Sequence, residues 1–248
     1  MADVNPAEAT PVIRLYTQTT NPYSEQVAAA LALKRQPFER IVSDDPEDVQ
    51  RWSPIARTLP VLEIDGRRKA DSPRILEWLE ELYPEPSLYS RDPKVAEAQR
   101  NLAEWSDSSF SFYWNRWRAA RYPRPGDDAP IDDSLLARIR DHVGRPFGRT
   151  PYTRADAREI EIIQELITRM TDLVGFLRER LFFHADEPSV ADVSVYAMLI
   201  VLRDGPIPQC AEAIAERPTL AAFVDRMARR IHSLEERSSA SRVDRRSP

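Results

Sequence analysis

Hydrophobic and polar positions change their spacing along the first part of the chain, between the short period of a strand and the longer period of a helix. Strand-like runs occupy residues 12–17, 38–43 and both sides of Asp65-Gly66 within 59–70, and helical runs occupy 22–35, 46–52 and 71–84. An Asp-Gly pair between two strand-like runs is a strong signal for a β-hairpin. The pattern therefore predicts the order β-α-β-α-β-β-α, with the last two strands joined by a tight turn.

The rest of the chain carries only helical patterns. Residues 85–92 are rich in proline and polar residues and are predicted to link a first domain at 11–84 to a second, all-helical domain at 93–232. Helices are predicted at about 93–121, 131–143, 154–182, 189–202 and 217–231, with a surface loop insertion at 122–133. Residues 233–248 have almost nothing to bury and are predicted to be a disordered tail.

Composition narrows the possible classes of protein. The 248 residues are 42% hydrophobic and 30% charged, as in soluble globular proteins, and the net charge of -5 does not indicate nucleic-acid binding. No apolar run reaches the ~18 residues that cross a bilayer, and the N-terminus lacks the pattern of an export signal. We therefore expect a cytoplasmic protein without a membrane or nucleic-acid partner.

Cysteine and histidine are scarce. The single cysteine, Cys210, excludes an internal disulfide, a Cys-x-x-Cys redox pair and a thiolate zinc cluster within this sequence. The three histidines are far apart and none has metal-ligand spacing, so no metal site is predicted.

Three short motifs stand at element boundaries. Leu59-Pro60-Val61 opens the hairpin, and Asp71-Ser72 precedes the helix that follows it. The N-terminus of a helix offers free N–H groups and partial positive charge to a carboxylate, while a neighbouring aspartate suits an ammonium group. Ser189-Val190-Ala191-Asp192 has the spacing of a capping box ahead of a helix that is apolar on nearly all sides.

In this order and spacing, the three motifs resemble the glutathione S-transferase superfamily. The resemblance implies an α/β thioredoxin-like N-terminal domain with a mixed four-stranded sheet, followed by an all-α C-terminal domain. It implies a cis peptide bond before Pro60, with Leu59, Pro60 and Val61 holding the cysteinyl part of glutathione. It also implies that Asp71 and Ser72 hold the γ-glutamyl end, whereas from the residues alone either one is equally a helix cap.

The segment Thr19–Val27 lines up with the active-site turn of that family. Thr20, Asn21 and Ser24 are the candidate donors to a glutathione thiolate, because a hydroxyl or amide at a helix N-terminus stabilises an anion. The tyrosine, serine and cysteine of the main classes are not plainly matched here, which argues against thiol-disulfide chemistry. Asn21 is alternatively only the N-cap of helix 22–35.

The predicted helix 93–121 contains the aromatic stretch "SFSFYWNRW". In the resembled family this helix lines the co-substrate pocket, so Tyr113 and Trp117 are candidates to contact the co-substrate. The other interpretation is packing in the core or at a dimer interface.

The resemblance implies a detoxifying homodimer that conjugates glutathione, as co-substrate, to a small hydrophobic electrophile. The alternative is a non-catalytic protein of the same fold. Residues 20–27 and 83–88 are also similar to stringent starvation protein A, a branch that binds RNA polymerase.

Overall fold

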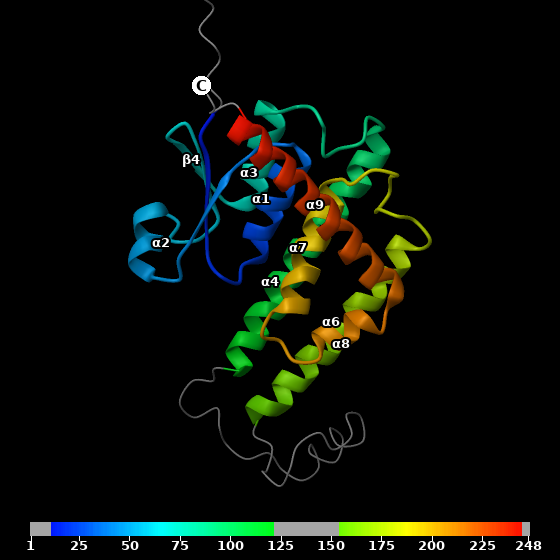
Figure 1. Ribbon diagram of the computed structural model, residues 1–248. Coiled ribbons are helices and arrows are strands. Elements are labelled where there is room, and N and C mark those ends of the chain that lie inside the picture. The colour runs from blue at the N-terminus through cyan, green and yellow to red at the C-terminus, as the bar shows by residue number, and fades with distance from the viewer. Residues whose placement is uncertain (1–10, 122–153, 245–248) are drawn as a thin grey trace, which may run out of the picture.

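The computed structural model describes residues 11–121 and 154–244 of the chain. The first domain is built on a four-stranded sheet of order β2-β1-β3-β4, in which β1 and β2 are parallel and the other pairs are antiparallel (Figure 1). Its elements in chain order are β1 (Ile13–Thr17), α1 (Pro22–Leu33), β2 (Glu39–Val42), α2 (Pro46–Trp52), β3 (Val61–Ile64), β4 (Arg67–Ala70) and α3 (Ser72–Leu82).

Helices cover both faces of the sheet because alternate residues of each strand point to opposite sides. Ile13 and Leu15 of β1 are fully buried and belong to the main core, which includes α1 and α3. Tyr16 instead belongs to a smaller core with residues of α2, and its ring centroid lies 4.9 Å from that of Trp52. In Figure 1, α2 lies on the opposite side of the sheet from α1 and α3.

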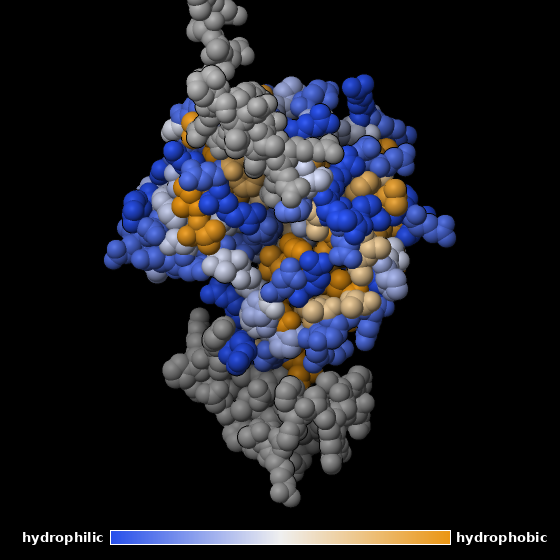
Figure 2. All heavy atoms as spheres, viewed as in Figure 1, coloured by the Kyte–Doolittle hydropathy of each residue, from blue (hydrophilic) through white to orange (hydrophobic). Residues whose placement is uncertain are grey.

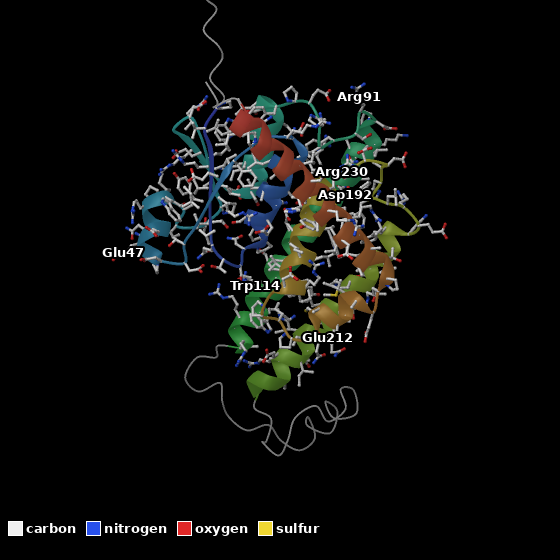
Figure 3. All side chains as sticks on the ribbon, viewed as in Figure 1. Glu47, Arg91, Trp114, Asp192, Glu212 and Arg230 are labelled. Atoms are coloured by element: carbon white, nitrogen blue, oxygen red, sulfur yellow. The ribbon has the colours of Figure 1, made fainter. Side chains whose placement is uncertain are left out.

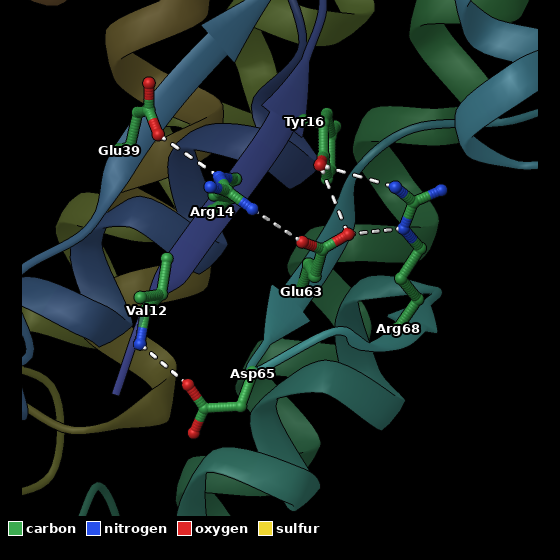
Figure 4. A network of polar contacts seen from close by, with 7 residues as sticks. All are labelled: Val12, Arg14, Tyr16, Glu39, Glu63, Asp65 and Arg68. Carbon is green, nitrogen blue, oxygen red and sulfur yellow. Dashed lines mark hydrogen bonds and ion pairs between the residues drawn. The ribbon is translucent and has the colours of Figure 1, made fainter. Parts of the chain in front are cut away.

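A row of alternating charges crosses the sheet (Figure 4). Glu39, Arg14, Glu63 and Arg68 are register partners on β2, β1, β3 and β4 in turn. The buried Glu63 carboxylate accepts hydrogen bonds from Arg14 Nη1 at 3.0 Å and Arg68 Nε at 2.6 Å. Burial alone would raise the pKa of Glu63, but these two guanidinium groups outweigh it and hold the pKa below its usual value. Opposite charges in register stabilise strand pairing.

The second domain consists of helices packed around α7. Its elements within the described chain are α4 (Pro93–Arg121), α6 (Arg154–Leu177), α7 (Val190–Asp204), α8 (Cys210–Ala215) and α9 (Pro218–Asp244). The buried Asp192 carboxylate accepts from the N–H and hydroxyl of Ser189, both at 2.8 Å, and from Phe183 N–H at 2.8 Å. The predicted capping motif therefore fixes the start of α7 and also holds the preceding loop.

The two domains share one core. Helix α1 of the first domain packs against α7 and α9 of the second as well as against β1 and α3. Polar residues predominate on the face shown in Figure 2, with smaller apolar groups over both domains. No helix in the described part of the chain has the length and hydropathy needed to cross a membrane.

The predicted fold class is confirmed, but several predicted element ends are wrong. Helix α6 ends at Leu177 rather than near 182, because Arg178 has a left-handed φ of 55°. Helix α9 continues to Asp244, although a disordered tail was predicted from 233. Extending an existing helix costs little, and Glu235, Glu236 and Arg237 are good helix formers. The predicted helix 131–143 and the whole loop insertion 122–133 lie outside the described residues.

Candidate functional site

A cavity of about 1040 Å³ lies between the first domain and α4. Its volume is at the upper end of the range of small-molecule sites. The loop between β1 and α1, the turn before β3, the start of α3 and one face of α4 line it. The lining residues are Gln18, Thr19, Thr20, Asn21, Pro22, Tyr23, Asp44, Val49, Arg57, Thr58, Leu59, Pro60, Asp71, Ser72, Pro73, Asp107, Ser108, Phe110, Ser111, Trp114, Asn115 and Arg118.

Asn21 joins two walls of the cavity. Its side-chain oxygen accepts from Ser24 N–H at 3.1 Å, as an N-cap of α1 does, and its Nδ2 donates to the Leu59 carbonyl at 3.0 Å. The amide NH₂ has two hydrogens, so one donor remains for a ligand. Thr20 is exposed, and its hydroxyl has no hydrogen-bond partner among residues 11–121 and 154–244.

Ser24 does not line the cavity. Its side chain is fully buried, and within the described chain its hydroxyl makes no hydrogen bond. Tyr16, another hydroxyl of this region, donates to Glu63 on the α2 side of the sheet. Of the three candidate donors predicted from sequence, the structure therefore brings Thr20 and Asn21 to the cavity but not Ser24.

The turn before β3 presents backbone to the cavity. The peptide bond between Leu59 and Pro60 is cis, as the sequence resemblance implied, and both residues line the cavity. In the part of the chain that is described, the N–H of Leu59 has no hydrogen-bond partner. Val61, by contrast, is 1% exposed in β3 and lies in the small core beneath the turn, so its side chain does not reach the cavity.

Asp71 and Ser72 lie where β4 meets α3. Asp71 occupies the N-cap position, but its carboxylate makes no capping hydrogen bond and is 59% exposed beside Arg74. Its φ of 75° is unusual for a residue with a side chain and stores local strain. The carboxylate thus remains available at the cavity, although a cap was the alternative interpretation. Ser72 is buried and lines the cavity.

Asp107 on α4 is a site residue that the sequence analysis missed. Its carboxylate accepts from Gln26 Nε2 at 3.1 and 3.2 Å at the junction of the two domains. Burial raises the pKa of Asp107 to about 6, hydrogen bonds from Gln26 and Ser194 oppose this, and the nearby charge of Asp71 adds to the increase. Nothing in the local sequence marks Asp107, because its position depends on how α4 meets α1.

Of the aromatic residues of α4, two line the cavity and two others contact α6. Tyr113 and Trp117, expected as substrate contacts, are buried toward α6, where Tyr113 OH accepts from Arg169 and Trp117 Nε1 donates to Glu159. That expectation is wrong for the cavity, which is lined instead by Phe110 and Trp114. At 100° per residue the four side chains project within about 100° of one another, with Phe110 and Trp114 toward the cavity and Tyr113 and Trp117 toward α6. The core interpretation fits Tyr113 and Trp117.

Two arginines were also missed. Arg57, in the turn before Leu59, and Arg118, in the last turn of α4, line the cavity, and neither has a carboxylate partner among the described residues. A sequence carries no signal for an unpaired arginine, since pairing depends on the folded chain. No group of three or more potential metal ligands occurs in the described chain.

The fold and this site define a two-domain protein with a thioredoxin-like domain, a helical domain and a ligand-sized cavity between them. Residues 15–87 match the family model of the glutathione S-transferase N-terminal domain, and residues 167–227 match that of the C-terminal domain. Together the two matches cover more than half of the chain. The chain therefore belongs to the glutathione S-transferase superfamily.

Individual relatives are more distant. Maleylacetoacetate isomerase of Pseudomonas aeruginosa is 35% identical over 100 residues, which are 37% of this chain and 47% of that protein. The chain thus matches less than half the length of this relative.

Solved structures resemble the whole fold. A glutathione S-transferase of Methylobacterium radiotolerans, in complex with glutathione sulfonate, is 25% identical with a TM-score of 0.58 and covers 87% of this chain and 89% of its own. A glutathione S-transferase of Methylobacillus flagellatus with glutathione bound is 21% identical with a TM-score of 0.64, over 90% of this chain and 98% of its own.

Proposed function

We propose that this protein is an enzyme that conjugates the thiol of glutathione to a small electrophile. The family membership supports a transferase, and the two structural relatives described above hold glutathione or its sulfonate. The single observation that carries the proposal is the arrangement of accessible polar groups in one cavity. The unpaired N–H of Leu59, the uncapped carboxylate of Asp71 and the donors of Thr20 and Asn21 all line it.

Each part of glutathione has a matching group. The free N–H of Leu59 is available to pair with the peptide backbone of the cysteinyl residue. The Asp71 carboxylate suits the ammonium group of the γ-glutamyl end, and the start of α3 at Ser72 suits its carboxylate. Arg57, which has no carboxylate partner among residues 11–121 and 154–244, is a cation for the second carboxylate.

The chemistry requires the sulfur as a thiolate. A free thiol has a pKa of ~8.5. Lowering that pKa by one unit requires the site to stabilise the thiolate over the thiol by ~1.4 kcal/mol. Hydrogen bonds from Thr20 and from the remaining N–H of Asn21 supply a stabilisation of that order. The thiolate then attacks the electrophilic carbon, a C–S bond forms, and the leaving group departs with its electron pair. The thiol proton passes to solvent.

Two further features of the proposal come from the family resemblance. We infer a detoxifying role and a homodimer, as is expected for this class of enzyme. Both are tested independently of the chemistry, the first by growth under electrophile stress and the second by sedimentation.

The thiolate donors are tested by conjugation of glutathione to 1-chloro-2,4-dinitrobenzene. Thr20→Val and Asn21→Ala are each expected to lower kcat/KM about tenfold, the value of one hydrogen bond to an anion. Each variant is also expected to raise the apparent thiol pKa in the pH–rate profile. Thr168→Val is the matched control, because within the described residues that hydroxyl bonds only to the Gln164 carbonyl on α6, away from the cavity. Full rates in both cavity variants would contradict the donor assignment.

The binding site is tested separately by calorimetry with glutathione. Asp71→Asn is expected to weaken binding about tenfold, since it removes the charge opposite the ammonium group. An unchanged affinity would remove Asp71 from the site. If the wild-type protein binds no glutathione at all, the non-catalytic alternative, a GST-fold interaction protein such as an RNA polymerase-binding regulator, replaces the enzyme.

A further inference from the structure

The α4 wall of the cavity is more polar than the apolar pocket expected from sequence. Its residues follow one helix face at spacings of three and four. They are Asp107, Ser108, Phe110, Ser111, Trp114, Asn115 and Arg118. A purely hydrophobic electrophile would leave most of these polar groups unused.

Trp114 is the flat surface of this wall. Figure 3 labels it on α4, close to the loop between β1 and α1. Its ring stacks on the buried Phe110, with centroids 5.5 Å apart and planes at 21°, and lies 5.5 Å from the ring of the buried Trp117. These contacts hold the half-buried indole in place. A fixed aromatic face of this kind favours a planar ligand group stacked against it.

Arg118 lies one helical turn beyond Trp114 on the same face. Two other arginines of α4 and α6 have carboxylate partners: Arg116 contacts Glu165 at 2.9 Å, and Arg169 contacts Asp172 at 2.7 Å. Arg118 has no carboxylate partner within residues 11–121 and 154–244. A basic residue in the last turn also complements the helix dipole, but Arg121 does the same without lining the cavity. Arg118 therefore presents an accessible guanidinium group to a ligand in the cavity.

The α4 wall has an acidic residue at one end and a basic residue at the other. Asp107 at one end is close enough to Asp71 for the charge of Asp71 to raise its pKa. Arg118 at the other end is about 16 Å away along the helix axis, at ~1.5 Å per residue. The acidic end suits the ammonium group of glutathione, which leaves Trp114, Asn115 and Arg118 for the co-substrate.

We propose that the co-substrate is a planar, aromatic or conjugated electrophile that carries a carboxylate. Its planar part stacks on Trp114, and Arg118 binds the carboxylate with its guanidinium fork. This inference rests on the proposed conjugation reaction and specifies its substrate class.

Two matched electrophiles test the inference: 4-chloro-3,5-dinitrobenzoate and the neutral 4-chloro-3,5-dinitrobenzamide. In both, the glutathione sulfur replaces chloride, which leaves with the C–Cl electron pair, and the thiol proton passes to solvent. With rates divided by the uncatalysed rates, the wild type is expected to prefer the benzoate at least about tenfold. Arg118→Gln is expected to lower kcat/KM for the benzoate by about 10- to 100-fold, the range for a charged hydrogen bond.

The same variant is expected to leave the benzamide within about twofold, and Arg118→Lys to restore part of the benzoate rate. Arg116→Gln is the matched control, because it removes one charge from the same helix outside the cavity. It is expected to change neither rate. Equal effects of Arg118→Gln on both electrophiles, or none on either, would overturn the inference and leave the conjugation reaction standing.

A binding measurement separates the two proposals. Quenching of tryptophan fluorescence by the benzoate, without glutathione, is expected to weaken about tenfold in Arg118→Gln. Binding that depends on Arg118 in a protein that conjugates neither electrophile would sustain the carboxylate site and reject the proposed reaction. Absence of both binding and turnover would overturn both.

Discussion

Asp107 is partly buried and Asp192 is fully buried, and the two carboxyls have different surroundings. Burial raises the pKa of each to about 6. Asp192 is held by three donors, two from Ser189 and one from Phe183, and its role is to fix the start of α7. Asp107 lines the cavity, and the negative charge of the Asp71 carboxylate raises the pKa of Asp107 further. The two residues show that a raised pKa alone does not mark a site, and that the neighbouring groups decide its meaning.

The ionisation of Asp107 makes a testable contribution to stability. Its folded pKa of about 6 lies above the value of 3.8 for an unperturbed carboxyl, so the folded state binds more protons between pH 4 and 6. Stability from this group therefore falls as pH rises through that window, by up to roughly 3 kcal/mol. Asp107→Asn removes this loss, so the variant should gain stability relative to the wild type from pH 4 to pH 7.

Urea denaturation at unit pH steps measures this difference. Only the change of the difference with pH matters, because the substitution also alters hydrogen bonds to Gln26 by an amount that does not depend on pH. The exposed Asp186 provides the control, since Asp186→Asn makes the same chemical change at the surface and outside the cavity. Parallel stability curves for Asp107→Asn and the wild type would contradict the raised pKa, because they would mean that folding leaves the pKa of Asp107 unchanged.

At the scale of elements, features set by neighbouring residues could be predicted and features set by packing could not. The hairpin at Asp65-Gly66 and the cap of α7 by Ser189 follow from the backbone preferences of a few adjacent residues. Which side of α4 faces the cavity depends on how that helix meets the first domain. The sequence therefore predicts Tyr113 as a cavity residue, whereas the structure has Trp114 there. The position of Arg118 in the cavity, without a carboxylate partner among the described residues, could not be predicted for the same reason.

One structural feature joins α1, α3 and the segment that leads to the second domain. Lys34, at the end of α1, has a fully buried side chain that contacts Glu80 of α3 at 2.7 Å. Its ammonium group also donates to the carbonyls of Tyr83 and Pro86, at 2.7 and 3.1 Å. Glu80 in turn accepts from Leu88 N–H at 2.7 Å. The pair thus holds residues 83–88 against the first domain.

Lys34→Met should destabilise the protein by about 3–5 kcal/mol, because it leaves the Glu80 charge and two carbonyls without their partner. The double variant Lys34→Met/Glu80→Gln should recover part of the loss, since the uncompensated charge is gone. Urea midpoints of the single and double variants measure both effects. A loss below about 1 kcal/mol in Lys34→Met would mean that water replaces the ammonium group and that the pair does not hold the segment.

At the scale of the whole molecule, α1 makes the two domains one folding unit. Ten of its twelve residues are buried, because the helix packs on the sheet on one side and on α7 and α9 on the other. Its alanines from Ala28 to Ala30 are 0–2% exposed. Without the second domain, the side of α1 that meets α7 would lie open to water, and the Gln26 amide would lose its acceptor Asp107.

We therefore expect the chain to unfold in a single transition. Trp52 and Trp78 report on the first domain, and three tryptophans of α4, Trp105, Trp114 and Trp117, report on the second. Replacing all the tryptophans of one domain by phenylalanine leaves tryptophan fluorescence from the other domain only. In each variant, the urea midpoint measured by fluorescence should coincide with the midpoint measured by circular dichroism. A fragment of residues 11–92 should show no cooperative transition. Separate midpoints would mean that the α1–α7 contact is weaker than its burial implies, so that the cavity walls can part while each domain stays folded.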